Sequence, residues 1–245
     1  MQTYLQNLAY RTGVRRLTLS VIIPCYNEVQ TIEEVLNRVE AVGMAEEIII
    51  VDDGSTDGTR EVLQRIEAEN RPNVRILYHQ VNQGKGAAVV TGFSAATSDV
   101  FLIQDADFEY DPREYPVLLK PLEEGIASVV YGSRFLGGPR KAMNFWNMVA
   151  NRILTLTTNI LYNAILSDME TCYKVFRADV VRGIRIHARR FEFEPEITAK
   201  VLRQGIRIYE VPISYNGREW NEGKKIHWTD GPIALWTLIK YRFLK

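Results

Sequence analysis

Two carboxylates one residue apart follow an apolar run near the middle of the chain. Asp105 and Asp107 come directly after the run VFLIQ, and Glu109 lies two residues further on. Carboxylates with open coordination positions suit Mg²⁺ or Mn²⁺ that also holds substrate phosphates. A turn at the end of a strand can aim both carboxylates at one ion, with Glu109 as a third oxygen ligand. The other interpretation of DAD is an acidic turn that caps the following helix.

Two further loops with polar side chains also follow apolar runs. The loop DDGSTDGT (52–59) begins with two adjacent carboxylates, which can hydrogen-bond a base or a ribose. A well-capped turn explains the Gly, Ser and Thr of this loop but not the two acids. The loop PCYNE (24–28) contains Tyr26, whose flat ring can pack on a nucleobase.

The sequence lacks the residue patterns of a cysteine nucleophile, a phosphate-binding loop and a nicotinamide-binding site. Cys25 has no histidine nearby in the sequence, and the three histidines have no triad spacing, so we expect a structural thiol. The run NQGKG (82–86) lacks the GxxxxGK[ST] spacing of a phosphate loop, and a glycine-rich helix start close to a ligand explains it better. GxGxxG is absent, so a nicotinamide enzyme has no support.

Short β-branched runs alternate with helical stretches through the first half of the chain. Nearly continuous apolar strands separated by helices predict an α/β fold with a mostly parallel central sheet and helices on both faces. Ligands of such sheets bind beyond the carboxyl ends of the strands, where the polar loops lie. Strands are predicted over 17–23, 47–51, 74–78, 100–104 and 128–131, and helices over 31–42, 57–69, 85–96 and 113–124.

The composition is that of a globular protein with a packed core, since 46% of the 245 residues are hydrophobic and 24% are charged. Thirty basic residues balance thirty acidic ones, which argues against nucleic acid as a partner. Two cysteines cannot build a disulfide framework, so we expect a cytoplasmic protein. We expect no secretory signal, because the N-terminal segment has no apolar core, and no transmembrane helix, because no apolar run reaches roughly 18 residues.

Charge is unevenly distributed along the chain. The segment 131–167 contains no acid but includes Arg134, Arg140, Lys141 and Arg152, whereas 99–124 holds eight acids and two bases. This contrast suggests a cation site beside a surface that receives an anion; unrelated solvated faces are the alternative.

The segment 144–167 predicts a helix with one polar stripe and a wide apolar arc. Asn144, Asn147, Asn151, Thr155 and Thr158 recur at helical spacing, and mostly apolar residues fill the remaining positions. Such a helix suits the surface of an anionic membrane, with Arg140 and Lys141 at its start. Burial against the sheet or in a dimer interface is the alternative. The segment 232–244 is a second candidate surface.

The order of the loops PCYNE, VDDGSTDGT, NQGKG, DAD and YGSR resembles the family-2 glycosyltransferases with the GT-A fold. The later runs FEFEPEITAKVLRQG, EVPISYNGREWNEGKKI and DGPIALWTLIKYRF resemble the polyprenyl-phosphate hexosyltransferases of this family, most of all the dolichyl-phosphate mannosyltransferases. The resemblance covers residues 18–243. It implies one Rossmann-like GT-A domain over 1–245, with a nucleotide-binding half (18–132) and an acceptor and membrane-facing half (133–245) that carries C-terminal acceptor-side helices.

The resemblance also assigns roles to single residues. Asp105, Ala106 and Asp107 match the motif that binds the metal and the diphosphate, whereas many relatives have Gln where this chain has Glu109. Arg134 matches a phosphate-binding arginine, and Arg218 with Lys224 matches a basic pair that closes over the donor. Asp107, Arg134, Arg218 and Lys224 are therefore the expected catalytic residues. The expected nucleoside contacts are Pro24, Tyr26, Glu28, Val51 and Asp53.

The implied reaction is an inverting, Mg²⁺- or Mn²⁺-dependent transfer of a hexose, with mannose favoured, from a nucleotide-sugar to a polyprenyl phosphate. GDP-mannose is the favoured donor and UDP-glucose the next. A phosphate acceptor with a second pKa of about 6 is largely ionised at neutral pH and needs no strong base, which agrees with the absence of an obvious histidine base. The alternatives are a sugar or protein hydroxyl acceptor, or a non-catalytic nucleotide-sugar-binding subunit.

The resemblance places the protein peripherally at the cytoplasmic face of a membrane. Members of the family differ in carrying C-terminal membrane spans, so a membrane protein or a second copy of the chain is a further expected partner.

Overall fold

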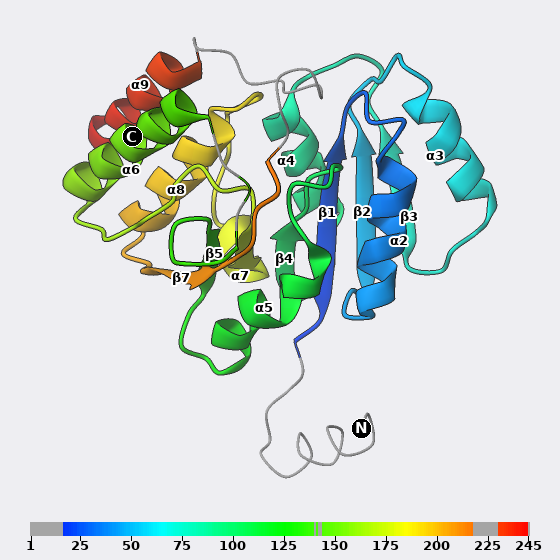
Figure 1. Cartoon of the computed structure of the whole chain (residues 1–245), viewed down its shortest axis with the longest axis horizontal. Coiled ribbons are helices and arrows are strands. Elements are labelled where there is room, and N and C mark those ends of the chain that lie inside the picture. The colour runs from blue at the N-terminus through cyan, green and yellow to red at the C-terminus, as the bar shows by residue number, and fades with distance from the viewer. Residues whose placement is uncertain (1–16, 140, 142–143, 218–229, 245) are drawn as a thin grey trace.

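A seven-stranded sheet with the order β3-β2-β1-β4-β6-β5-β7 organises the chain (Figure 1). The computed structural model describes residues 17–139, 141, 144–217 and 230–244. The strands are β1 Leu19–Cys25, β2 Glu47–Asp52, β3 Val74–Tyr78, β4 Val100–Ile103, β5 Val129–Ser133, β6 Lys174–Arg177 and β7 Ile208–Pro212.

The five strands predicted from apolar runs are all confirmed, with ends that shift by a few residues. Strands β1, β2 and β4 are buried on both faces, which requires apolar residues at successive positions rather than at every second one. The predicted α/β class with a mostly parallel sheet is therefore confirmed.

One strand runs against the others. β6 lies antiparallel between β4 and β5, with Leu102 opposite Val175 and Tyr131 opposite Lys174. The start of β6 consequently lies at the same edge of the sheet as the carboxyl ends of β4 and β5. We did not predict β6, which has only four residues and a lysine as its first member.

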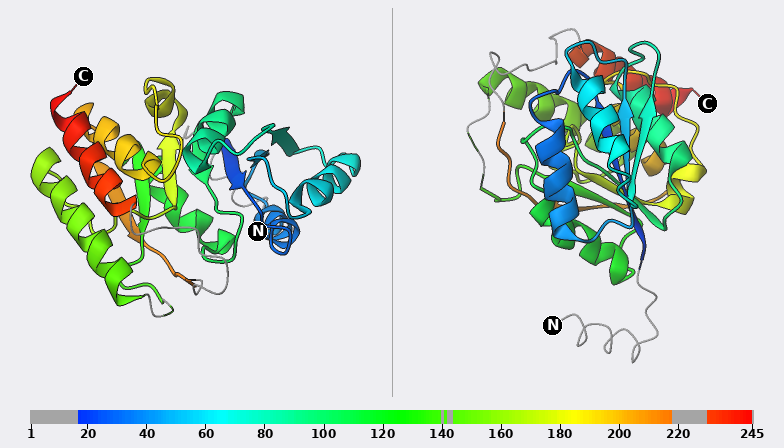
Figure 2. Two further views of the ribbon diagram at one scale, coloured as in Figure 1. Left: turned by 90° about the horizontal axis from the view of Figure 1, so that it is seen from above. Right: turned by 90° about the vertical axis from the view of Figure 1, so that its right-hand side faces the viewer.

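Helices cover both faces of the sheet. α4 packs across β1 and β2 on one face, whereas α2 and α5 lie on the other (Figures 1 and 2). The apolar residues of α2 recur at helical spacing and are buried, and Gly43 with a φ of 66° ends the helix. The helices are α2 Ile32–Val42, α3 Thr59–Ala68, α4 Lys85–Ala95, α5 Tyr115–Glu123, α6 Phe145–Tyr162, α7 Ala178–Arg182, α8 Phe193–Arg203 and α9 Asp230–Phe243, with a 3₁₀ turn η1 at Pro112–Glu114.

Helices α6, α8 and α9 pack together at one end of the molecule, around a second small core that includes Leu154 and Leu238 (Figure 2). The predicted helix within 144–167 forms as α6, and Asn144 caps it by accepting a hydrogen bond from the Trp146 N–H. Asn151, Thr155 and Thr158 of its polar stripe are buried, whereas Asn144 and Asn147 near its start are exposed. Most of its apolar arc is also exposed, so the arc does not pack against the sheet. The exposed apolar residues are Phe145, Trp146, Ile153, Leu156 and Ile160 on α6, and Ile233, Trp236 and Phe243 on α9.

Candidate active site

The nucleoside edge, as we call it, consists of the carboxyl ends of β1 and β2 together with residues 82–84. The buried Asp53 accepts hydrogen bonds from the Gln83 N–H at 2.9 Å and the Gly84 N–H at 2.7 Å. His79 Nδ1 lies 2.7 Å from the same carboxylate, and its Nε2 lies 2.9 Å from Thr91 Oγ1. Asp53 therefore holds the glycine-rich turn in place at the position where we predict the nucleoside.

The two glycines of this edge allow backbone segments to approach closely. A side chain at Gly84, whose φ is 99°, would meet the Arg189 carbonyl oxygen at 2.3 Å. A side chain at Gly54 would meet the Asn82 backbone nitrogen at 2.6 Å. Helix α4 begins at Lys85, directly after Gly84, which confirms that NQGKG is a helix start.

The remaining predicted nucleoside contacts lie at or beside the same edge. Pro24 is opposite Val51 in the β1–β2 pair, and the half-buried Tyr26 follows β1 directly. The buried Glu28 accepts a hydrogen bond from the Thr31 hydroxyl at 3.0 Å, and its own N–H donates to Thr59 Oγ1 at 2.9 Å. Their contacts with a nucleoside stay predictions.

The DAD turn follows β4. Lys85 Nζ lies 2.8 Å from the Asp105 carboxylate and 3.6 Å from that of Glu194. Burial would lower the pKa of Lys85, but the negative charges around it, Asp105 first and Glu194 among them, together raise it. The carboxylate of the buried Asp107 accepts the Glu109 N–H at 2.9 Å, which gives the turn its shape.

The donor set of this turn suits a cation that is shared with phosphates. Among the described residues, no three His, Cys, Asp or Glu side chains form a cluster that could hold a metal ion by themselves. Mg²⁺ commonly takes one or two carboxylates and completes its shell with substrate phosphates and water, so Asp105 and Asp107 fit that mode of binding. Glu109 accepts a hydrogen bond from the Tyr215 hydroxyl at 3.0 Å, and its role as a third ligand stays a prediction.

The ion-pair edge, as we call it, consists of the ends of β4 and β5 and the start of β6. Arg134, directly after β5, donates to both carboxylate oxygens of Asp168 at 2.6 and 2.7 Å. Asn151 of α6 donates to the same carboxylate at 2.8 Å. Burial would raise the pKa of Asp168, but the charge of Arg134 together with the hydrogen bonds from Arg134 and Asn151 lowers it. The guanidinium carbon of Arg134 lies 5.1 Å from the centre of the Tyr215 ring.

A second buried pair joins β6 to α8. Lys174 Nζ lies 2.5 Å from the carboxylate of Glu194, and both side chains are buried. The same nitrogen donates to the Thr171 carbonyl oxygen. Glu194 also neighbours Lys85, so charged groups connect the DAD turn with β6.

The sequence analysis missed four charged residues of this site. Lys85 and Asp168 are the partners of Asp105 and Arg134, whereas Lys174 and Glu194 pair with each other. A usable signal was present at Lys174, because a lysine within the otherwise uncharged run TCYKVF implies either an exposed strand or a buried counter-charge.

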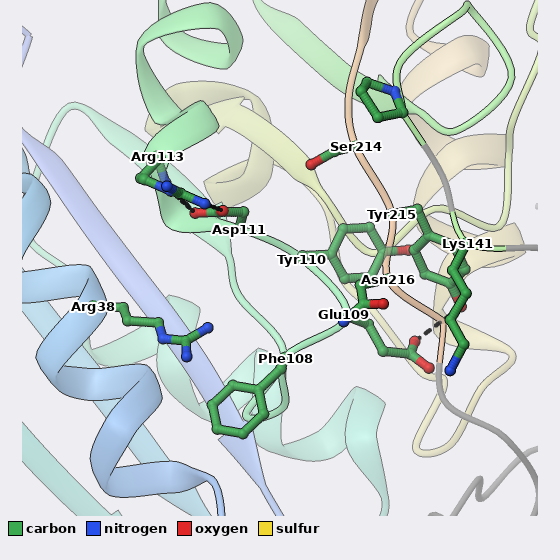
Figure 3. A pocket seen from close by; sticks show the side chains of 11 residues that line it. Arg38, Phe108, Glu109, Tyr110, Asp111, Arg113, Lys141, Ser214, Tyr215 and Asn216 are labelled. Atoms are coloured by element: carbon green, nitrogen blue, oxygen red, sulfur yellow. Dashed lines mark hydrogen bonds and ion pairs between the residues drawn. The ribbon is translucent and has the colours of Figure 1, made fainter.

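A pocket of about 570 Å³ adjoins the DAD turn (Figure 3). Arg38 lies on its wall with its guanidinium carbon 4.5 Å from the centre of the Phe108 ring, and Arg113 is paired with Asp111. Glu109, Lys141 and Tyr215 face the pocket from the other side. The mixture of cations and hydrogen-bonding groups suits a polar or anionic ligand group rather than a hydrocarbon chain.

Two of the predicted catalytic residues, Arg218 and Lys224, lie outside the described residues, as does Arg140. Their predicted roles at the donor and at the membrane therefore stay predictions.

Solved structures share this fold. Glucosyl-3-phosphoglycerate synthase from Mycobacterium tuberculosis, solved with Mg²⁺ and uridine diphosphate, aligns with a TM-score of 0.72 at 20% identity, over 98% of this chain and 84% of its own. The same enzyme with Mn²⁺, uridine diphosphate and its product aligns with a TM-score of 0.70, over 94% and 81%. At this identity the comparison shows the fold, and both structures contain a divalent metal.

Named relatives are closer in sequence. The undecaprenyl-phosphate mannosyltransferase of Micrococcus luteus is 32% identical over 214 residues, which are 83% of this chain and 85% of the relative. The dolichol-phosphate mannosyltransferase of Pyrococcus furiosus is 30% identical over 213 residues, or 85% of this chain, and the match spans 59% of that longer relative. The family model Glycosyl transferase family 2 matches residues 20–185, from β1 through the DAD turn and β6 to just beyond α7. This chain therefore belongs to glycosyltransferase family 2, and it is an enzyme similar to the polyprenyl-phosphate mannosyltransferases.

Proposed function

We propose that this enzyme transfers a hexose, with mannose favoured, from a nucleotide-sugar to a polyprenyl phosphate at a membrane surface. One observation carries the proposal: one side of α6 contacts the buried Arg134–Asp168 ion pair, and the other side is apolar and exposed. Its inner side holds Asp168 through Asn151, and Asp168 holds Arg134. Its outer side exposes Trp146 and Leu156. A lipid phosphate needs a cationic site next to an apolar surface, and this helix joins the two.

The donor would lie along the nucleoside edge, with GDP-mannose favoured over UDP-glucose. Tyr26 would pack on the base, and Asp53 would bind the nucleoside. Asp105 and Asp107 would hold Mg²⁺ or Mn²⁺, which neutralises the diphosphate leaving group when bound. Arg218 and Lys224 would add positive charge near the same leaving group.

The acceptor would bring its own nucleophile, because a phosphate monoester is largely ionised at neutral pH. Arg134 would draw the phosphate toward the sugar and reduce the repulsion between two anions. The preformed bonds to Asp168 hold the guanidinium in place, so little orientation is left to be lost on binding. Attack in line with the leaving diphosphate would invert the anomeric centre.

The substrate test is a panel of GDP- and UDP-sugars with polyprenyl phosphate, in Mg²⁺ or Mn²⁺, scored by mass spectrometry. We expect a polyprenyl-phosphate hexose from a GDP-sugar and no product in excess chelator. Transfer only to free sugars or to protein hydroxyls would show that the acceptor is a hydroxyl group and not a polyprenyl phosphate. Nucleotide-sugar binding without transfer or donor hydrolysis would indicate a non-catalytic subunit.

The membrane test uses the exposed apolar surface of α6 and α9. No helix within the described ranges is both long and apolar enough to span a bilayer. We expect the protein to float with anionic vesicles in a salt-sensitive manner, and Trp146→Glu to weaken that binding. Ile126→Glu is the matched control, because Ile126 is also exposed but lies in the turn before β5. Unchanged flotation of a folded Trp146→Glu variant would exclude α6 as the membrane-binding helix.

A further inference from the structure

Glu170 lies on the segment that connects α6 to β6. Because Leu102 of β4 is opposite Val175 of β6, the residues just before β6 lie at the ion-pair edge. The DAD turn with Asp105 flanks this position at the end of β4, and Arg134 flanks it at the end of β5. The charges that act on Glu170 include Arg134 and Lys174, so Glu170 lies near the predicted phosphate-binding arginine.

Among the described residues Glu170 forms no ion pair, in contrast to Asp105, Asp168 and Glu194. Its Oε1 is shielded from solvent and has no hydrogen-bond partner in the part of the chain that the structure describes. A buried polar atom without a partner is rare in folded proteins and calls for a proton or a ligand. The three acids that do have a cation are Asp105 with Lys85 at 2.8 Å, Asp168 with Arg134 at 2.6 Å, and Glu194 with Lys174 at 2.5 Å.

The surroundings favour the neutral form of Glu170. Burial, followed by the negative charge of Glu194 on α8, raises the pKa of Glu170 to about 7. Lys174 on β6 and Arg134 after β5 act in the opposite direction, whereas Asp168 on the same segment raises the pKa further. The Tyr131 hydroxyl on β5 also senses Glu170, which contributes to the raised pKa of that tyrosine. A neutral carboxylic acid carries one O–H, which is a hydrogen-bond donor.

We propose that Glu170 is a specificity residue that donates a hydrogen bond from its neutral carboxyl group to the phosphate of the acceptor. The proposal rests on the proposed function and names a group that distinguishes a phosphate from a hydroxyl. A phosphate bound beside Arg134 supplies the missing acceptor for the Glu170 proton. Its negative charge also favours that proton, because a like charge disfavours the ionised acid.

The test compares Glu170→Gln, Glu170→Ala and the surface control Glu124→Gln on transfer to polyprenyl phosphate. Glutamine keeps a neutral donor of similar shape, so we expect Glu170→Gln to retain transfer. We expect Glu170→Ala to raise the acceptor KM by about 10-fold or more, which is the effect of losing one hydrogen bond to a charged group. The donor KM should be unchanged in both. Wild-type kcat/KM for the acceptor should fall as pH rises through about 7, whereas the alkaline fall should be absent in Glu170→Gln.

A second measurement detects the proton on the Glu170 carboxyl group without relying on catalytic turnover. Infrared difference spectra of the wild-type protein between about pH 6 and pH 9 should show a carboxylic acid C=O band that Glu170→Gln lacks. Absence of that band in the wild type overturns the proposal. So does a Glu170→Gln variant that folds but transfers as poorly as Glu170→Ala, because Glu170 would then act as a base or as an obligatory charge. Failure of the proposed function is distinguishable, since the wild type itself would then not use polyprenyl phosphate.

Discussion

The nucleoside edge and the ion-pair edge hold Asp53 and Asp168 by different means. Asp53 is held mainly by the backbone N–H groups of Gln83 and Gly84, with His79 beside it. Asp168 is held mainly by the guanidinium of Arg134, whose backbone N–H also donates to it. Backbone donors stay where the fold puts them, but a side-chain cation can share its charge with an arriving anion. The geometry around Asp53 is therefore fixed by the fold, whereas the charge around Asp168 can be redistributed when an anion binds.

The difference has an energetic side. Burying a charge costs more free energy than its partner commonly returns, so buried ion pairs are poor sources of stability. Backbone hydrogen bonds to a carboxylate avoid burying a second ion. We therefore interpret the ion pairs of Asp105, Asp168 and Glu194 as groups that are kept for binding phosphate and metal rather than for stability. Mutations at the two edges should separate these roles.

The largest effect on stability should come from Arg134→Ala, which leaves Asp168 buried and unpaired. We expect the free energy of unfolding to fall by about 3–5 kcal/mol, as is typical when one partner of a buried ion pair is removed. Urea denaturation measures this change. The double variant Arg134→Ala/Asp168→Asn should recover part of the loss, and a cost below about 1 kcal/mol for the single variant would contradict the dependence of Asp168 on Arg134.

Asp107→Asn should abolish most of the transfer while leaving the fold intact. We expect a loss of about 100-fold or more in kcat, because one charge is removed from the predicted metal and diphosphate site. The asparagine oxygen can still accept the Glu109 N–H, so melting curves should match the wild type. Asp179→Asn on the exposed side of α7 is the control. Full activity of the folded Asp107→Asn variant in excess chelator would remove the metal from the reaction.

Stability should also depend on pH through Glu170. Its folded pKa of about 7 lies above its ordinary value of 4.5, so the folded state binds this proton more tightly than the unfolded state. The resulting stabilisation is complete below pH 4.5 and is lost as pH rises through about 7. The loss amounts to about 3 kcal/mol. Urea denaturation across this range should show a steeper fall for the wild type than for Glu170→Gln, and parallel curves would contradict a raised pKa.

The smallest effect should come from His79→Ala at the nucleoside edge. Asp53 keeps its two backbone donors in this variant, so we expect a loss of only about 1–2 kcal/mol in the free energy of unfolding. Thermal melts measure the loss of stability, and calorimetric titration measures any change in nucleotide binding. A loss as large as that of Arg134→Ala would remove the contrast between the two edges.

Much of the fold followed from the apolar runs. β1 and β2 could be predicted because a strand that is buried on both faces must be apolar at every position. The loops after β1, β2 and β4 could be assigned to one edge because parallel strands end on the same side of a sheet. β6 escaped prediction, since its short length gives little local signal and its place depends on pairing with β4 and β5.

The face of α6 that turns inward was also beyond prediction from the sequence. The spacing of its polar residues defined a stripe, but a stripe can face water or the protein interior. Tertiary structure settled this, because Asn151 in the stripe meets the buried Asp168, while residues such as Leu154 on the same side join the core with α9.

The sequence by itself determined the sheet, the position of the chemically active loops and the family, because these depend on local patterns and on residue order. Only the tertiary structure decided which charges meet. Ion pairs form between different elements of the fold: Lys85 with Asp105, Arg134 with Asp168, and Lys174 with Glu194. It also left Glu170 without an ion pair in the described part of the chain. The physical reason is that an ion pair depends on distance in space and on burial, and neither quantity is encoded by the spacing of residues along the chain.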